Sequence, residues 1–408
     1  MENNRNIGSP RFLLYGIGGV YNYGCEAIVR GTEIMLREVW PDAIIKYASV
    51  RLEDDAQRLK DTRIEIVPRI QYSRYSLRNI CRKAASMARL SWVPIMEKLD
   101  FITDSDVVLS IGGDLYALHP NGRYNSRLMK LGELIIRRGK KFIIWGASIG
   151  PFDKNRHAEI IFRKHLNKVH LITSREPAST DYLQAIGVQK NVISCADPAY
   201  AVSPEIFQSV RPNNHLCIGI NLSPLSVRHS MPGRDLKSIC AEQAKTIVAL
   251  VKGLDAHVVL IPHVICDFNE NDDDLRYQQS IVNALPKDVA SHVEIYDRDL
   301  GFLDAKMQII KCHLILAARM HCAINALAAG VPTILISYSQ KAIGMAKYIY
   351  GNKRWVIPLQ EFNSTTVLDL VQKILAEDQS IRNHLKNRLP EIQKDVRKGA
   401  IALANLCA

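Results

Sequence analysis

Short, continuously apolar segments alternate with longer segments of helical character along most of this chain. Runs of that kind are typical of parallel strands that helices cover on both faces. The order therefore predicts an α/β fold, in which the carboxyl ends of the strands lie along one edge of each sheet. The expected strands are Phe12–Gly16, Ile44–Ala48, Val107–Ile111, Phe142–Trp145, Leu171–Ser174 and Val192–Cys195, followed by Leu216–Ile220, Val258–Ile261, Val293–Tyr296, Leu314–Leu316 and Thr333–Ile336.

The length of 408 residues favours more than one domain, because a single core stops growing below that size. A proline-containing stretch from Ser203 to Asn214 resembles a linker between the two series of strands. We expect two Rossmann-like, doubly wound domains with a cleft between them, at residues 1–205 and 212–366. The mostly helical residues 367–408 are expected to pack on both domains.

Composition narrows the class of protein. The chain is 47% hydrophobic and 23% charged, which is usual for a globular protein. No apolar run approaches the ~20 residues that cross a bilayer, and nine scattered cysteines fit reduced thiols. We therefore expect a cytoplasmic protein. Its 53 basic residues exceed its 41 acidic ones, giving a net charge of +12 that favours anionic partners.

Much of that charge lies between Arg63 and Leu90, where one acid, Glu65, accompanies seven basic residues: Arg63, Arg69, Arg74, Arg78, Arg82, Lys83 and Arg89. Arg74, Arg78 and Arg82 are four residues apart and would share one face of a helix. We favour a solvated helix. The alternative is a patch for anionic lipid, with peripheral attachment to the inner face of a membrane, or for a diphosphate-linked acceptor.

Four expected strands of the first half end in glycine or polar residues. The first runs into Gly16-Ile-Gly18-Gly19, followed by Asn22, Gly24 and Glu26, and the third into Gly112-Gly113-Asp114. Ser148 follows the fourth strand and Arg175 the fifth. These loops should meet at one sheet edge, where backbone amides can approach a ligand. The first loop is not GxGxxG, so a nicotinamide cofactor is not expected.

The strongest signal lies between Leu314 and Ile336. A buried strand ends in Arg319-Met320-His321, a helix of small residues follows, and Gly330 ends that helix before the next strand. Arginine suits phosphate or carboxylate, and histidine exchanges a proton near neutral pH. Tyr338 and Lys341 are placed to reach the same edge. These residues predict a site for an anionic substrate that undergoes proton transfer.

Other groups of polar residues are weaker indications of a functional site. His263 follows an expected strand, and Asp272-Asp273-Asp274 comes shortly afterwards. Such a run could hold a metal ion, but we favour solvated carboxylates and expect no metal site. The remaining histidines show no partner pattern.

In their order along the chain, the segments Asn22-Tyr-Gly-Cys-Glu-Ala27, Ser110-Ile-Gly-Gly-Asp114, Ser148-Ile-Gly-Pro151, Ser174-Arg-Glu176, Asp197-Pro-Ala199 and Arg319-Met-His321 resemble the polysaccharide pyruvyl transferase family. Three positions depart from its pattern: Cys25 stands where many members have aspartate, Asp114 replaces a glycine, and Met320 stands where leucine is usual, a conservative change. The resemblance implies two Rossmann-type domains in a GT-B-like arrangement. It also implies transfer of pyruvate from phosphoenolpyruvate to two sugar hydroxyls, with release of phosphate.

On this resemblance we expect His321 to be the general acid or base, with Arg319 and Arg175 holding the donor. Substrate contacts are expected from Asn22, Gly24, Glu26, Gly112, Gly113, Asp114, Ser148, Met320, Tyr338 and Lys341. The partners would be phosphoenolpyruvate and a sugar acceptor, free or lipid-linked, with neither cofactor nor nucleic acid. The alternatives are a glycosyltransferase that uses a nucleotide sugar, and a non-catalytic basic binding protein.

Overall fold

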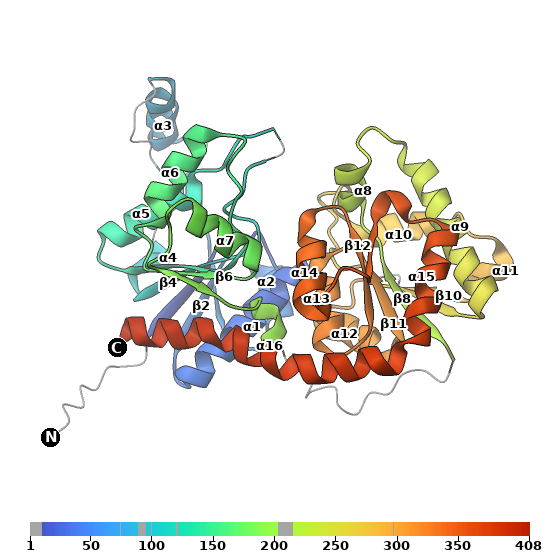
Figure 1. Cartoon of the computed structure of the whole chain (residues 1–408). Helices are drawn as coiled ribbons and strands as arrows, with labels where there is room; N and C mark the ends of the chain where they lie inside the picture. The colour runs from blue at the N-terminus through green and yellow to red at the C-terminus, as the bar shows by residue number, and fades with distance from the viewer. Residues whose placement is uncertain are drawn as a thin grey trace. The chain divides into compact units, whose positions relative to one another are not determined.

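The computed structural model describes residues 10–73, 75–88, 95–98, 100–119, 121–202, 215–296 and 298–408. They form two compact units, each built around its own sheet (Figure 1). Unit 1 comprises the described residues up to Val20, Ile28–Pro198 and Asp395–Ala408. Unit 2 comprises Tyr21–Ala27 and Ala199–Lys394. The expected linker from 203 to 214 lies outside the described residues.

The sheet of unit 1 has seven strands, and every pairing in it is parallel. Its order is β3-β2-β1-β4-β5-β6-β7, so the direction of winding reverses between β1 and β4. Ligands bind at such a switch point in open α/β sheets. The strands are β1 (Arg11–Tyr15), β2 (Ile44–Ser49), β3 (Glu65–Pro68), β4 (Val107–Ile111), β5 (Lys141–Ala147), β6 (Leu171–Ser174) and β7 (Val192–Ser194).

Helices cover both faces of this sheet. On one face, Phe142 and Ile144 pack with side chains of α5 (Arg127–Arg137), α6 (Arg156–Leu166) and α7 (Pro177–Ala185). On the other face, the Trp145 indole donates to Thr32 of α1 (Tyr23–Val39) at 3.1 Å. Trp145 also lies against Gly399 of α16 (Asp378–Cys407). Alternate residues of one strand thus face opposite layers, which explains its continuously apolar sequence.

Unit 2 repeats this topology with six parallel strands in the order β10-β9-β8-β11-β12-β13. Its switch point lies between β8 (Cys217–Asn221) and β11 (Leu314–Ala317). The other strands are β9 (His257–Leu260), β10 (Val293–Ile295), β12 (Thr333–Ser337) and β13 (Val356–Pro358). The helices of this unit are α8 (Pro224–Ser230), α9 (Leu236–Leu254), α10 (Asp274–Val282), α11 (Lys287–Ala290), α12 (Phe302–Lys311), α13 (Met320–Ala328), α14 (Gln340–Tyr350) and α15 (Ser364–Ala376).

The fold class predicted from the sequence is confirmed, with two doubly wound sheets. Each expected strand is present within one or two residues of its predicted ends. β3 and β13 were not predicted. Both are short edge strands that end in proline, and edge strands tolerate proline because one side of their backbone is unpaired. Gly330 ends α13 with a φ of 73°, as predicted.

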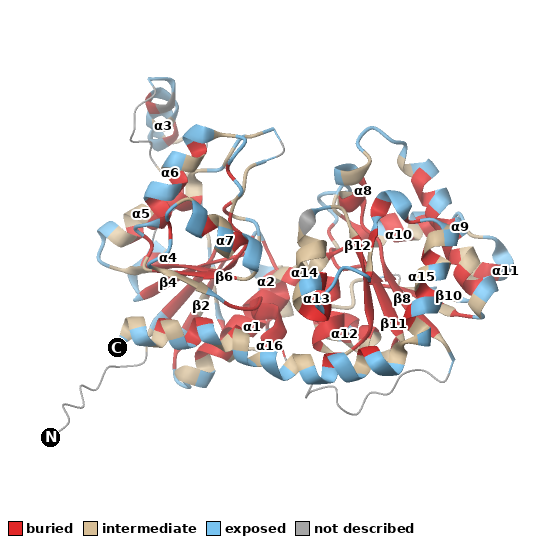
Figure 2. Cartoon of the chain, in the orientation of Figure 1, coloured by how far each residue is buried: buried red, intermediate tan, exposed pale blue. Residues whose placement is uncertain are grey.

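Buried residues concentrate in the strands and in the inner faces of the large helices (Figure 2). Three shorter helices complete unit 1: α2 (Leu52–Arg58), α3 (Leu77–Met87) and α4 (Asp100–Thr103). Arg74 and Arg89 of the basic segment lie outside the described residues. No helix in the described ranges is both long enough and apolar enough to span a membrane.

Candidate functional site

The glycine-rich segment Tyr21–Ala27 belongs to unit 2, although it follows the first strand of unit 1. Asn22 forms an antiparallel bridge with Val264, and the Tyr23 amide donates to the His263 carbonyl at 3.0 Å. The Asn22 side chain accepts from the Gly24 amide at 2.9 Å and so starts α1. The first turn of α1 is thereby placed beside the loop that follows β9.

His321 packs directly on this segment. A Cβ atom added to Gly24 would lie 2.5 Å from Cγ and from Nδ1 of His321, so the imidazole occupies the space that another residue type would fill. His321 is the second residue of α13 and is half-buried. Glu26, in the first turn of α1, is buried. Gly24 and His321, far apart in sequence, therefore meet in unit 2.

Arg319 occupies the N-cap position of the same helix, and two carboxylates hold its side chain. Its Nε donates to Asp274 Oδ1 at 3.1 Å, and its Nη2 donates to Asp272 Oδ1 at 2.6 Å and to Asp274 Oδ1 at 2.8 Å. Burial alone would lower the pKa of Arg319, but Asp274 and Asp272 raise it above its ordinary value. The guanidinium is thus permanently charged and fixed in direction.

The aspartate run is therefore not a solvated loop, and that interpretation was wrong. Asp274 is fully buried and also accepts from the backbone amides of His263 and Val264. Asp273 is buried too, and its Oδ1 caps α10 by accepting from the amides of Leu275 and Arg276. Burial raises the pKa of both carboxyls. The sequence missed this because the partner, Arg319, lies 45 residues away.

Two asparagines complete the cluster and were not identified from the sequence. Asn221 ends β8, and its Oδ1 accepts from the Arg319 amide at 2.7 Å. Asn325 of α13 places Nδ2 3.0 Å from His263 Nε2. A polar residue at the end of an apolar strand was a usable signal for Asn221, because the same rule found the other loops.

His263 is a second histidine of this cluster. Its ring lies edge-on to Tyr23, with centroids 5.5 Å apart. Burial, with smaller contributions from the charges of His321 and Arg319, lowers the pKa of His263 to about 3. His263 is therefore neutral at physiological pH and can act there as a hydrogen-bonding group rather than as a cation.

The remaining predicted residues of unit 2 lie at the carboxyl ends of β11 and β12. Met320 is the first residue of α13 and is half-buried. Tyr338 follows β12, and its ring centroid is 5.9 Å from that of His229. Lys341 lies in the first turn of α14. Strands β11 and β12 are neighbours, so these residues share the edge that carries Arg319 and His321.

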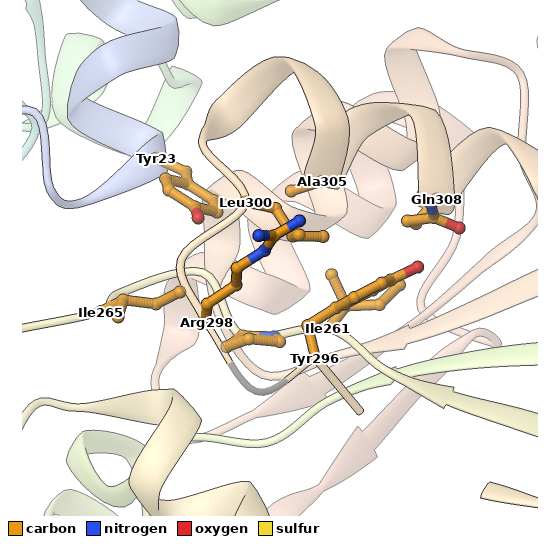
Figure 3. A pocket seen from close by; sticks show the side chains of 9 residues that line it. Tyr23, Ile261, Ile265, Tyr296, Arg298, Leu300, Ala305 and Gln308 are labelled. Carbon is orange, nitrogen blue, oxygen red and sulfur yellow. The ribbon is translucent and has the colours of Figure 1, made fainter. Parts of the chain in front are cut away.

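A small pocket of unit 2 has Tyr23 as part of its lining. Its lining includes Tyr23, Ile261, Ile265, Tyr296 and Leu300, and Figure 3 shows these side chains around a narrow space. The space amounts to about 10 Å³, close to the minimum that one water molecule needs. It is too small for a sugar or a phosphate ester.

Arg175 lies in unit 1, at the end of β6. Its Nε donates to Ser148 Oγ at 2.9 Å, its Nη1 to Asp197 Oδ2 at 2.7 Å, and its Nη2 approaches Asp114 Oδ1 at 3.5 Å. A Cβ on Gly113 would lie 2.3 Å from Nη2, so glycine is required where the loop passes the guanidinium. Three of the four loops predicted to meet at this edge do meet here, and they contribute Gly113 and Asp114, Ser148, and Arg175. Asn22, Gly24 and Glu26 of the fourth loop lie in unit 2 instead.

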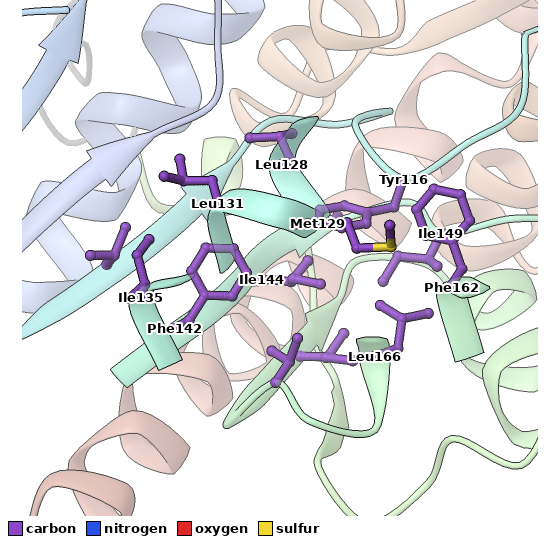
Figure 4. Packing of buried hydrophobic residues seen from close by; sticks show 14 of the residues in the cluster. Tyr116, Leu128, Met129, Leu131, Ile135, Phe142, Ile144, Ile149, Phe162 and Leu166 are labelled. Atoms are coloured by element: carbon purple, nitrogen blue, oxygen red, sulfur yellow. The ribbon is translucent and has the colours of Figure 1, made fainter. Parts of the chain in front are cut away.

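Two further glycines bring the loops at the switch point together. Gly16 has a φ of 134°, and a Cβ there would lie 2.6 Å from the Ile111 carbonyl oxygen. Gly112 has a φ of 131°. Both values are unfavourable for other residues. The hydrophobic core of unit 1 is shown in Figure 4, where Tyr116 and Ile149, which follow β4 and β5, pack with Phe162.

The two clusters have related chemistry. Each presents a fixed arginine at the carboxyl edge of a parallel sheet, with one buried and one more exposed aspartate. The cluster of unit 2 adds His321, a group able to transfer a proton, at the N-terminus of a helix that favours anions.

Comparison with known proteins matches the sequence of this chain to a family. The model of the family described as polysaccharide pyruvyl transferase matches residues 22–340. The chain is also 22% identical over 297 residues to the amylovoran biosynthesis protein AmsJ of Erwinia amylovora, covering 70% of this chain and 69% of that protein.

Two solved structures that resemble this chain in fold contain a uridine nucleotide or a sugar nucleotide. The UDP-GlcNAc 2-epimerase of Neisseria meningitidis, solved with UDP-GlcNAc, is similar with a TM-score of 0.61 and 13% identity, covering 97% of this chain and 99% of that one. HepE of Anabaena, solved with UDP and glucose, has a TM-score of 0.59 and 12% identity, covering 98% and 99%. At these identities the likeness shows the fold alone.

Proposed function

Because the chain belongs to the polysaccharide pyruvyl transferase family, we propose that it transfers pyruvate from phosphoenolpyruvate to two hydroxyls of one sugar in a cell-surface polysaccharide or its precursor. The products are a pyruvate ketal and phosphate. The observation that carries this proposal is the position of His321. It lies at the start of α13, beside the fixed charge of Arg319, and packs on Gly24 of a segment inside the family match.

The chemistry requires that one proton be added to carbon and that each of the two hydroxyls lose its proton. A proton adds to the methylene carbon of phosphoenolpyruvate, and the neighbouring carbon, now electron-poor, is attacked by one sugar hydroxyl, which loses its proton. The second hydroxyl then attacks the same carbon and displaces the phosphate, which carries away the remaining proton. We assign the exchange of protons to His321, because an imidazole both donates and accepts near neutral pH.

The donor carries a phosphate and a carboxylate, and the proposal assigns basic groups to them. Arg319 contributes through Nη1, since its Nε and Nη2 already bind Asp274 and Asp272. Arg175 of unit 1 is the second proposed donor arginine. Asn22, Gly24, Glu26, Gly112, Gly113, Asp114, Ser148, Met320, Tyr338 and Lys341 stay predicted substrate contacts.

The test is release of phosphate from phosphoenolpyruvate by the purified chain with a panel of free and lipid-linked sugar acceptors. A parallel series replaces phosphoenolpyruvate with UDP-glucose. We expect acceptor-dependent phosphate release with phosphoenolpyruvate and none with the nucleotide sugar. Acceptor-dependent release of UDP instead would overturn the proposal in favour of a glycosyltransferase.

Variants assign the roles. His321→Asn should lower kcat by at least about a hundredfold, as expected when a general acid–base group is lost. His292→Asn, at an exposed turn of the same unit, is the matched control and should leave kcat unchanged. Equal activity of the two variants would remove His321 from the mechanism.

The arginines are tested as Arg319→Lys and Arg175→Lys. Truncation would leave the buried Asp274 or Asp197 without its cation and cost about 3–5 kcal/mol, so that loss of activity could reflect unfolding. Lysine keeps the charge but not the fork geometry. We expect a raised KM for phosphoenolpyruvate and a smaller loss of thermal stability than truncation would cause, because the buried aspartates keep a cation.

A further inference from the structure

Helix α3 of unit 1 presents an apolar face to solvent. Leu77 is 80% exposed, Ile80 57% and Met87 86%. Cys81 and Ala84 are exposed too, and the spacing of these residues places them on one side of the helix with the other three. Asn79 and Ala85, by contrast, are buried, so α3 turns its large apolar side chains outward.

This exposure is local rather than general. The described chain exposes eleven large apolar side chains, and five of them lie between residues 70 and 87: Ile70, Tyr75, Leu77, Ile80 and Met87. Figure 1 shows α3 standing off from the sheet of unit 1, beyond α6. A clustered apolar patch of this kind marks an interaction surface.

The charge around the patch is of one sign. Between Glu65 and Glu97 the sequence contains six basic residues and no acidic one. Of these, Arg69 has a side chain that is 7% exposed and paired with Glu97, and Arg74 and Arg89 lie outside the described residues. On α3 itself, Lys83 is exposed, and Arg82 is half-buried with its Nε bonded to Asn79 Oδ1 at 2.9 Å. Arg78 is also exposed, and its Nε donates to the Ile95 carbonyl, which anchors the helix to unit 1. A partner with an anionic surface and an apolar interior fits both features.

We propose that α3 docks unit 1 onto a membrane surface rich in anionic lipid, with Leu77, Ile80 and Met87 inserted at the level of the headgroups. A short helix with an apolar face and basic residues beside it lies in the plane of such an interface. Lys83 and Arg82 then face the lipid phosphates while their aliphatic stems rest on the apolar layer. The proposal is independent of the reaction proposed above.

The test uses the purified full chain and two kinds of vesicle, one of phosphatidylcholine and one of phosphatidylcholine and phosphatidylglycerol in equal parts. We expect co-sedimentation with the anionic vesicles that weakens as salt is added. A polarity-sensitive dye on Cys81, the exposed cysteine of the described chain, should shift to the blue as α3 enters the bilayer.

Variants separate the two contributions. Leu77→Ser/Ile80→Ser/Met87→Ser should weaken vesicle binding by at least about tenfold, since burial of such side chains drives insertion. Arg82→Gln/Lys83→Gln should weaken it by about fivefold per charge and remove the preference for anionic lipid. Val50→Ser/Ile401→Ser, at exposed apolar positions elsewhere in unit 1, is the matched control and should bind as the parent does.

Two results would overturn the proposal. One is vesicle binding by the triple serine variant that equals that of the control. The other is a dimer in solution that this variant converts to a monomer, with no vesicle binding by either form, because the apolar face of α3 would then serve a second copy of the chain. The activity of every variant on a free sugar acceptor is expected to be unchanged.

Discussion

Arg175 and Arg319 are each held by one inner and one outer aspartate. The inner residues, Asp197 and Asp274, are buried, whereas the side chain of Asp114 is 60% exposed and lies 3.5 Å from Arg175. An outer carboxylate competes with an anionic ligand for the same guanidinium. On the proposed function, in which Arg175 holds the donor, Asp114 is therefore expected to lower affinity for the donor, while Asp197 holds the arginine.

Asp114→Asn should accordingly tighten binding of phosphoenolpyruvate. We expect up to about a fivefold decrease in Kd, the scale of an exposed ion pair. Isothermal titration with phosphoenolpyruvate measures it, and Asp104→Asn, an exposed acid at the opposite end of β4, is the control. An unchanged Kd would mean that Arg175 does not contact the donor.

His263 should make folding sensitive to acid. The pKa of His263 is about 3 in the folded chain and rises to about 6.5 on unfolding, so between these values the unfolded state binds more protons. The contribution to stability is complete above about pH 6.5 and is lost as pH falls toward 3, by about 1.4 kcal/mol per pH unit.

Urea unfolding of His263→Gln and of the parent, at pH values between about 4 and 7, tests this. The difference in unfolding free energy between the two proteins should shrink as the pH falls. His165, whose pKa burial lowers to about 4, is present in both proteins and cancels in the comparison. A difference that stays constant with pH would contradict the assignment.

At the scale of elements, the start of α1 and the start of α13 depend on one another. Gly24 leaves room for the His321 ring, and the Asn22 side chain holds the first turn of α1. Through this contact, a glycine-rich loop after the first strand sets the position of a histidine ring almost three hundred residues later in the sequence.

Gly24→Ala should displace the imidazole while leaving the fold intact. A Cβ cannot lie 2.5 Å from the ring, so His321 must rotate, and we expect kcat to fall at least about tenfold. Gly18→Ala is the matched control, because the space around Gly18 is open and its φ is not in the left-handed region. Similar kcat values for the two variants would show that the position of the ring is not critical.

At the scale of the molecule, α16 contributes to both units. In unit 2, Arg382 donates to the His313 carbonyl at 2.8 Å, before β11. In unit 1, Gly399 lies against Trp145 and Thr173, and Leu403 is fully buried. The last helix thus covers one face of the first sheet with residues that follow the whole of the second sheet in the sequence.

Truncation of single leucines on α16 should destabilise one unit without the other. Leu403→Ala should destabilise unit 1 by about 2–5 kcal/mol, whereas Leu385→Ala, equally buried on the same helix, should destabilise unit 2 by a similar amount. Hydrogen exchange with mass spectrometry compares the protection of β4 and β5 in unit 1 with the protection of β11 and β12 in unit 2. Loss of protection in both sheets from either variant would show that the units unfold together.

The sequence by itself determined every strand except the edge strands β3 and β13, the parallel direction of the strands, and the residues at their carboxyl ends. Continuous apolar runs and the glycines and polar residues that follow them are local features, and in a parallel sheet they place side chains along one edge. Gly113, Asp114, Ser148 and Arg175 were grouped correctly for this reason.

Only the tertiary structure decided which distant groups pair. The bonds from Arg319 to Asp272 and Asp274, the packing of His321 on Gly24, and the outward apolar face of α3 each depend on neighbours remote in sequence. A carboxylate run looks the same whether it faces water or a buried guanidinium. Its burial is set by the spatial order of the strands in the sheet. Strands β9 and β11 lie on either side of β8, so the loop after β9 comes beside the helix after β11.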